Sequence, residues 1–363
     1  MAIKIQMNKT VKGLEKLRIY LRGQSKFGKT SLFRNIILEE FDGDATKGLL
    51  IGCGNEIGYT LLDNLQTTHI NTWKDLKELE TFLIKGKGTE QNIELIAFDT
   101  VDELIPIAEK EVMRLSQIQT GKPCDSINKA LGGYNAGRNK VKEIIKEYFT
   151  TLYKAGFGVF AISHTKLKTI VEKGTDESEG YQVLTTNLEN SYECIFADIF
   201  DCVLTGTVDK DVSDGKIENI SRKLYFRGDN FVEAGVRMKG MSVPEYILVD
   251  DDPRQFAKDF IQTLKDGMRN SATKKITDEE YKKEVEEEKK QAEKDLKQVQ
   301  QEVEQQEKVE EEQDIDELKA KLKSLMTTTE SKNKVKEFMK GNGVKSVKDL
   351  STEQLEELIG LLS

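Results

Sequence analysis

The sequence has little of what disulfide-bonded, metal-rich or membrane-spanning proteins contain. Its four cysteines form no C-x-x-C pair, and it has only two histidines in 363 residues. Free thiols are therefore expected instead of a disulfide framework, and a histidine-rich metal site is not expected. No signal-peptide pattern and no apolar run of membrane-spanning length is present. We expect a soluble protein of the cytoplasm with no membrane partner.

An excess of positive charge is also lacking. The chain has 55 Lys and Arg against 64 Asp and Glu, which gives a formal net charge of -9. This balance argues against a globally basic nucleic-acid coat, although it leaves room for a local basic groove. The length exceeds that of one ordinary core and indicates two or three folded units.

The most informative segment present is a glycine loop that follows an apolar strand expected at Leu17–Leu21. The run GQSKFGKT fits G-x-x-x-x-G-K-T, and the helical apolar spacing after it predicts a helix. The glycines let backbone N–H groups turn toward phosphate oxygens, and the helix N-terminus adds a positive dipole end. Lys29 is expected to reach the β- and γ-phosphates, and Thr30 to hold Mg²⁺. The predicted nucleotide-binding residues are Gly23, Gln24, Ser25, Lys26, Phe27, Gly28, Lys29, Thr30 and Ser31.

A carboxylate at the end of a second apolar strand supports this site. A strand is expected at Leu95–Asp99, and its closing residue Asp99 is expected to hold Mg²⁺ opposite Thr30. The alternative is a buried strand whose closing aspartate only caps the next turn.

Two further polar residues follow predicted strands and should face the same edge of a parallel sheet. Glu56 follows the strand Gly48–Gly52 and is a candidate base for the attacking water; the alternative is a solvated loop glutamate. His164 follows the strand Gly158–Ser163 and is a candidate γ-phosphate sensor; the alternative is a structural histidine. The candidate catalytic residues are thus Lys29, Glu56 and His164.

Two polar stretches carry basic and aromatic residues and are interpreted as loops. Residues 165–190 contain Lys166, Lys168, Lys173 and Tyr181. The second stretch contains Lys122, Lys129, Tyr134, Arg138 and Lys140. Such loops can line a single-strand channel through phosphate pairing and base stacking, while solvated surface charge is the alternative for each lysine.

The rest of the pattern predicts three regions. Alternating strands and helices up to residue 270, including strands at 201–205 and 223–227 and a helix at 253–268, predict an α/β core with a mainly parallel sheet. Residues 271–314 are a charged linker in which Val285, Ala292 and Val299 form a thin stripe, typical of a single helical spacer more than of a coiled coil. Residues 315–363 predict a small all-α module, with a capping box at Ser351–Gln354.

The order of these parts resembles the RecA-like P-loop ATPases, and most closely the bacteriophage recombination ATPases of the Sak type. The resemblance rests on the P-loop, Glu56, the run LIAFDTVD at 95–102, Ser163-His164 with the polar stretch after it, and the segments 222–227 and 233–239. It implies ATP and Mg²⁺ as ligands, Glu56 as the catalytic glutamate and Asp99 as the Walker B aspartate. His164 stands where RecA itself has a glutamine sensor. The stretch after His164 occupies the position of the second DNA-binding loop.

The sequence and the resemblance together predict an ATP-hydrolysing protein that acts on single-stranded DNA in phage recombination or replication. We expect a homo-oligomer in the host cytoplasm, and contact of the C-terminal module with a single-strand-binding or replication protein. One alternative is a helicase loader or assembly factor that uses ATP as a switch. A small-molecule kinase is less favoured, because the sequence shows no arginine-rich lid.

Overall fold

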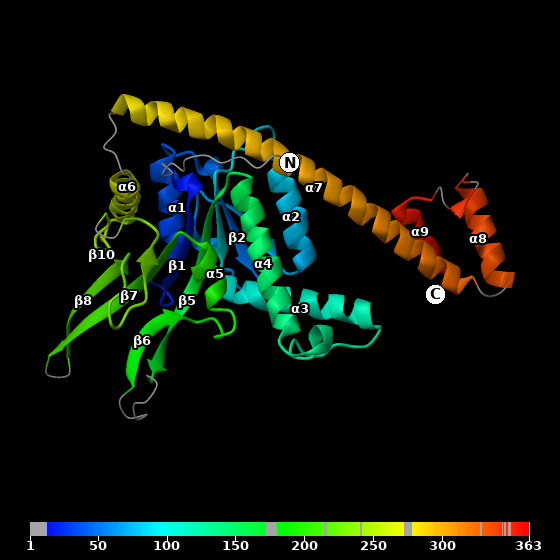
Figure 1. Cartoon of the computed structure of the whole chain (residues 1–363), viewed down its shortest axis with the longest axis horizontal. Helices are drawn as coiled ribbons and strands as arrows, with labels where there is room; N and C mark the ends of the chain where they lie inside the picture. Colours follow the sequence, from blue (N-terminus) through cyan, green and yellow to red (C-terminus); the bar gives the residue numbers. More distant parts are fainter. Residues whose placement is uncertain are drawn as a thin grey trace. The chain divides into compact units, whose positions relative to one another are not determined.

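The computed structural model describes residues 13–171, 180–213, 216–239, 242–271, 278–326, 329–342 and 344–362 except 345, 348 and 349. The chain divides into two compact units, Met1–Lys297 and Gln298–Ser363 (Figure 1). No helix in these described parts combines the length and the apolar character that crossing a membrane requires.

The first unit is built on a mainly parallel sheet. Its main path has the order β10-β8-β7-β1-β5-β4-β2-β3, and the steps from β7 to β3 are parallel. Strands such as β2 and β4 are buried along their whole length, which explains their continuous apolar runs. The predicted α/β class is therefore confirmed. The strands are β1 Arg18–Gly23, β2 Gly48–Cys53, β3 Gln66–Ile70, β4 Leu95–Asp99, β5 Gly158–Ile170, β6 Tyr181–Thr186, β7 Cys202–Ser213, β8 Lys216–Tyr225, β9 Gly235–Val236 and β10 Tyr246–Leu248.

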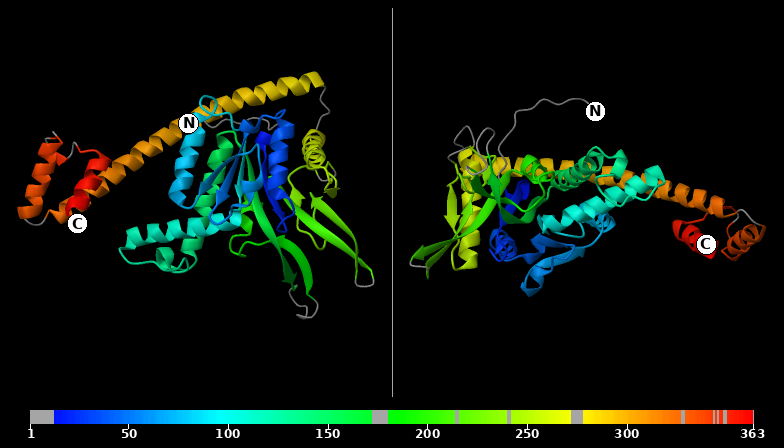
Figure 2. Two further views of the ribbon diagram at one scale, coloured as in Figure 1. Left: turned by 180° about the vertical axis from the view of Figure 1, so that it is seen from behind. Right: turned by 90° about the horizontal axis from the view of Figure 1, so that it is seen from below.

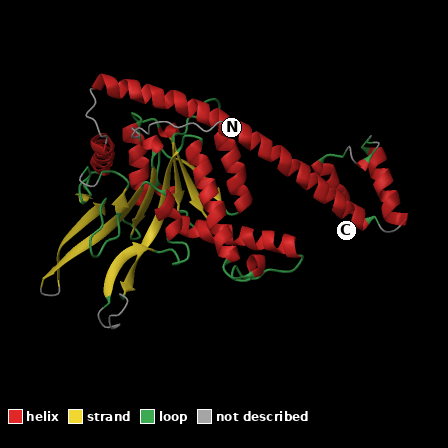
Figure 3. Cartoon of the chain, in the orientation of Figure 1, coloured by secondary structure: helices red, strands yellow, loops and turns green. Residues whose placement is uncertain are grey.

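Helices flank this sheet (Figure 3). Phe33 of α1 lies in one buried cluster with Phe256 and Phe260 of α6, and Lys265 of α6 pairs with Glu40 of α1 at 2.8 Å. The helices of the first unit are α1 Lys29–Glu40, α2 Trp73–Gly86, α3 Val101–Thr120, α4 Ala136–Lys154, α5 Cys194–Ile199 and α6 Pro253–Ser271, with short 3-10 turns at Leu14–Lys16, Ala45–Lys47, Gly58–Leu61 and Ala130–Gly132.

Two antiparallel hairpins extend the sheet beyond what the sequence predicts. Strand β5 runs on to Ile170 and pairs with β6, with Thr165 opposite Thr186. The interpretation of residues 165–190 as a loop is therefore wrong for both strands. β-branched residues such as Thr169, opposite Gln182, and Val183, opposite Lys168, favour an extended backbone. Strands β7 and β8 form the second hairpin. Both hairpins leave the body of the unit on the same side (Figures 1 and 2).

The second polar stretch is also more ordered than a loop. Its residues Arg138 and Lys140 lie on helix α4, which begins at Ala136. The amide of Leu131 donates to the Ser116 hydroxyl at 2.9 Å, which ties the turn before α4 to helix α3. This stretch is therefore a braced connection between two helices.

The second unit is helical, and it begins at Gln298, inside a long helix whose first part belongs to the first unit. Helix α7 Asp278–Leu325 is continuous, so the boundary expected between residues 314 and 315 falls inside a helix; α8 is Thr329–Gly341 and α9 is Thr352–Leu362. Leu322, Val335 and Leu355 lie in its buried cluster. The predicted capping box is present, because the Ser351 amide donates to Gln354 Oε1 at 3.0 Å and the Gln354 amide donates to Ser351 Oγ at 3.3 Å. Independent folding of the linker and the module stays a prediction.

Candidate nucleotide site

The glycine loop joins the end of β1 to the start of α1 at the carboxyl edge of the sheet. Gly28 has φ 104° and precedes the first helical residue, Lys29. A side chain would strain this left-handed backbone, which explains the second glycine of the motif. The buried ring of Phe27 covers Gly206 of β7, where a Cβ would lie 2.4 Å from a ring carbon. The loop thus has the strand–turn–helix context that a phosphate-binding loop requires.

Lys29 points back into its own loop. Its Nζ donates to the carbonyl oxygens of Gly23 at 2.9 Å and Gln24 at 3.1 Å, and lies 3.4 Å from Nδ1 of His164. Burial lowers the pKa of Lys29, and the charges of Asp99 and other nearby carboxylates oppose that shift. The ammonium is therefore held mainly by neutral acceptors, which the oxygens of a phosphate can replace.

Thr30 and Asp99 form the candidate magnesium position. The Thr30 hydroxyl donates to Asp99 Oδ2 at 2.7 Å. Burial raises the pKa of Asp99, and the Thr30 hydrogen bond opposes this. Among the described residues no group of three or more His, Cys, Asp or Glu could hold a metal on its own. One hydroxyl and one carboxylate nevertheless fit Mg²⁺, which takes oxygen ligands and completes its shell with water and substrate phosphates.

Glu56 lies in the turn after β2 and is partly exposed. Its Oε1 accepts a hydrogen bond from the Gly58 amide at 3.0 Å. Its charge partly opposes the lowering of the Lys29 pKa by burial and adds to the raising of the Asp99 pKa by burial, so Glu56 lies within electrostatic range of the loop. The geometry is compatible with a carboxylate that accepts a proton from water, and this role stays a prediction.

Strand β5 brings His164 beside Gly23 in the sheet register. The His164 amide donates to Asp102 Oδ2 at 3.0 Å, and its carbonyl accepts from the Asn187 amide at 2.9 Å. His164 therefore lies where β5 leaves the parallel sheet and enters its hairpin with β6. Asp102 has no role in the sequence-based site, although it stands three residues after Asp99 at the same edge.

The candidate DNA-binding residues lie on or near the β5–β6 hairpin. Lys166 Nζ donates to the carbonyl oxygens of Asn187 and Leu188 at 3.3 and 2.9 Å, and Lys168 pairs with Glu193 at 3.2 Å. Both lysines therefore brace the base of the hairpin. Tyr181 is 41% exposed, and Lys173 lies outside the described residues.

In the second polar stretch, three of the cations form ion pairs with carboxylates. Lys129 pairs with Asp125, Arg138 with Glu189 and Lys140 with Glu143, at distances of 3.0, 2.7 and 2.8 Å. Lys122 and Tyr134 are exposed. Each paired cation has part of its charge compensated locally, which weakens the case for this stretch as a phosphate-binding surface.

An ion pair between a buried arginine and a half-exposed glutamate lies beside the P-loop, and the sequence does not predict it. Arg22, the residue before Gly23, is 2% exposed and donates to Thr205 Oγ1 at 3.2 Å, to Glu233 Oε2 at 3.0 Å and to the Glu233 carbonyl. The Glu233 carboxylate also accepts from the Thr185 hydroxyl of β6. Burial acts to raise the pKa of Glu233, but Arg22 and these hydrogen bonds outweigh it and lower the pKa overall. The end of β1 is thus tied to both hairpins.

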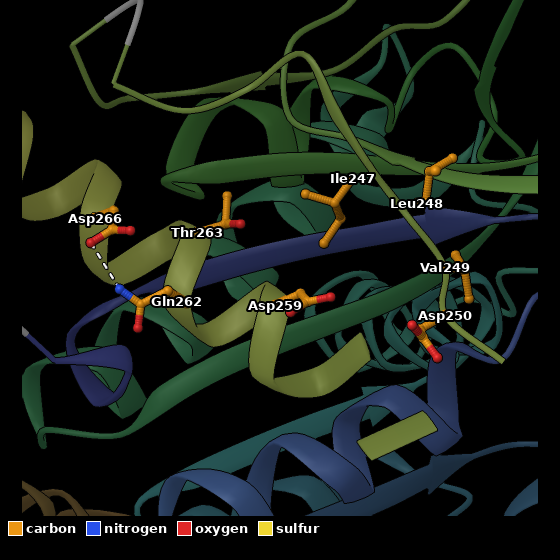
Figure 4. A pocket seen from close by; sticks show the side chains of 8 residues that line it. All are labelled: Ile247, Leu248, Val249, Asp250, Asp259, Gln262, Thr263 and Asp266. Atoms are coloured by element: carbon orange, nitrogen blue, oxygen red, sulfur yellow. Dashed lines mark hydrogen bonds between the residues drawn. The ribbon is translucent and has the colours of Figure 1, made fainter. Parts of the chain in front are cut away.

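A groove of about 600 Å³ lies elsewhere, between β10 and α6 (Figure 4). Asp250, Asp259 and Asp266 are among its lining residues, and such carboxylates would repel phosphate. Strands β8 and β7 separate β10 from β1 in the sheet. This groove is therefore not the nucleotide site.

Comparison with known proteins agrees with the loop geometry. Residues 15–238 match the family described as AAA domain. Among solved structures the chain is similar to a KaiC-like protein, PH0186, from the hyperthermophilic archaeon Pyrococcus horikoshii OT3, with 10% identity, 66% of this chain and 88% of that chain covered, and a TM-score of 0.36. The comparison with curated proteins finds no match. Because the family match spans more than half of the chain and includes the P-loop, the protein belongs to the AAA-domain family of P-loop ATPases.

Proposed function

We propose that the protein hydrolyses ATP with Mg²⁺ and uses the reaction to act on single-stranded DNA in phage recombination or replication. The observation that carries the proposal is a chain of two contacts: Lys29 Nζ lies 3.4 Å from His164 Nδ1, and the His164 carbonyl accepts from the Asn187 amide, which follows β6, at 2.9 Å. A nucleotide that draws Lys29 away from His164 changes the contacts at the strand that leads into the hairpin.

In the hydrolytic step, Lys29 exchanges its two carbonyl partners for oxygens of the β- and γ-phosphates. Mg²⁺, held by Thr30 and Asp99, neutralises charge on the phosphates when it is bound. Glu56 orients the attacking water and accepts its proton. His164 donates a hydrogen bond to the γ-phosphate and reports whether it is present.

Action on DNA is assigned to the hairpins. They leave the sheet on the side of the nucleotide site and carry exposed side chains, including Leu167 at 65% and Tyr181 at 41% exposure (Figure 1). Self-association into a homo-oligomer, and contact of the second unit with a single-strand-binding or replication protein, belong to the same proposal.

The test is ATP hydrolysis by the full-length chain without DNA, with single-stranded DNA and with duplex DNA of equal length. We expect turnover that requires Mg²⁺ and rises with single-stranded DNA, and none in the Lys29→Ala variant. A rate of ATP hydrolysis that neither single-stranded nor duplex DNA changes would favour a helicase loader or assembly factor. Phosphoryl transfer to an added nucleoside or other small acceptor would favour a kinase.

A further inference from the structure

The segment that follows β8 makes one β-bridge to strand β6 of the β5–β6 hairpin. Val232 forms a parallel bridge with Leu184 of β6. The Leu184 amide donates to the Phe231 carbonyl at 2.6 Å, and the Glu233 amide donates to the Leu184 carbonyl at 3.2 Å. Residues 231–233 therefore run alongside β6 at this single bridge, and the hairpin together with these residues is called the small sheet below.

The register of this small sheet places two exposed aromatic rings on one face. Side chains alternate along a strand, so Phe231 and Glu233 share a face with Val183 and Thr185 of β6. The hydrogen bond from Thr185 to the Glu233 carboxylate agrees with this assignment. Tyr181 is two residues before Val183 and lies on the same face. Phe231 is 67% exposed and Tyr181 is 41% exposed.

We propose that Phe231 and Tyr181 form a stacking platform for bases of single-stranded DNA. The inference rests on the proposed function and names the surface that binds the polynucleotide. Diagonal neighbours on adjacent strands are about 7–8 Å apart, a spacing that lets two rings hold two bases of an extended strand.

The charges around this face suit a polyanion better than do those of the chain as a whole. Two partly exposed lysines, Lys166 and Lys168, and the buried Arg22 stand at the base of the small sheet. Three carboxylates lie beside them: Glu193, Glu233, and Asp229, whose Oδ1 accepts from the Phe231 and Val232 amides at 2.7 Å. Lys166 is held by carbonyl oxygens, which leave its charge available to a phosphate. The cations and carboxylates named here balance, whereas the chain as a whole carries a net charge of -9.

Strand β5 connects the platform to the nucleotide site. Strand β5 carries both His164, 3.4 Å from Lys29, and Ile170, which faces Tyr181 across the hairpin. Binding of bases on this face would therefore act on strand β5, which also carries the contact to the P-loop lysine.

The experiment compares Phe231→Ala, Tyr181→Ala and the double variant with the wild-type chain. The affinity for a fluorescent oligothymidine is measured across a salt titration. Loss of one stacked base should weaken binding roughly 5- to 150-fold at every salt concentration. The slope of log affinity against log salt should not change, because no phosphate contact is lost. ATP turnover without DNA should equal that of the wild type.

Three further variants distinguish loss of stacking from a structural effect. Phe231→Trp and Tyr181→Phe keep an aromatic face and should keep the affinity. Leu248→Ala removes a side chain that is 61% exposed on β10 and should change nothing. Wild-type affinity in the double variant would overturn the platform while leaving the proposed function intact. If the double variant kept its DNA affinity but changed its oligomeric state, the two rings would belong to an interface between copies of the chain and not to a DNA platform. Absence of DNA binding by the wild-type chain would instead refute the proposed function.

Discussion

Removing the Glu233 carboxylate should destabilise the first unit far more than removing its partner Arg22. Arg22 is the buried member of the pair, with a side chain 2% exposed, whereas the side chain of Glu233 is 53% exposed. Glu233→Ala leaves a guanidinium without its counter-ion and out of reach of water. Breaking a buried pair in this way costs about 3–5 kcal/mol of unfolding free energy. Arg22 keeps Thr205 Oγ1 and the Glu233 carbonyl as acceptors, so we expect about 3 kcal/mol, the lower end of this range.

The reverse change should be mild. Arg22→Met keeps the apolar stem of the side chain in place and leaves behind a carboxylate that water can reach. We expect a loss of about 1 kcal/mol from the lost hydrogen bonds. Glu245→Ala, which removes an exposed carboxylate between β9 and β10, is the matched control and should stay within about 0.5 kcal/mol of the wild type.

Urea unfolding followed by tryptophan fluorescence measures these differences. The chain has a single tryptophan, Trp73, at the start of α2, so the signal reports the first unit alone. The m-value should stay constant while the midpoint falls. Equal losses in the Glu233 and Arg22 variants, or a larger loss for Arg22→Met, would refute the reasoning from burial.

The pH dependence supplies a second check on the same pair. The folded protein holds the pKa of Glu233 below its ordinary value, so the folded state releases this proton more readily than the unfolded state. The stabilisation is therefore fully present above the ordinary glutamate pKa and is lost as the pH falls through the lowered value. The difference in unfolding free energy between wild type and Glu233→Ala should shrink in acid and stay level at neutral pH.

Four further outcomes follow from the same geometry. Lys29→Ala should abolish ATP turnover without lowering the urea midpoint, because within the described residues the side chain bonds its own loop and His164. Wild-type turnover in this variant would show that the loop is not the nucleotide site. Glu56→Gln should keep nucleotide affinity and lower turnover about 10²- to 10⁴-fold, as judged by binding and single-turnover assays. A chain ending at Lys297 should still bind ATP in a fluorescent-nucleotide assay, because the first compact unit ends there. Leu355→Ala should cost about 2–5 kcal/mol in the second unit, seen by circular dichroism, and leave the Trp73 transition unchanged.

The local features of the protein could be predicted from the sequence because their parts are neighbours in the chain. The P-loop needs only its own glycines, Lys29 and the flanking strand and helix. Strand β4 was expected at its observed bounds, since a strand buried on both faces shows a continuous apolar run. The capping box before α9 is equally local, because its two partners lie three residues apart.

Only the tertiary structure decided the features that join distant segments. The polar edge strand β3 carries no apolar signal, and the hairpin of β5 with β6 depends on a register that polar residues specify weakly. Arg22 meets Glu233 across 211 positions and Asp102 meets His164 across 62, which no spacing rule can anticipate. Phe231 joins the face of Tyr181 only because Val232 bridges to Leu184. Sequence periodicity specifies which elements form, whereas long-range hydrogen bonding and burial determine which side chains they bring together.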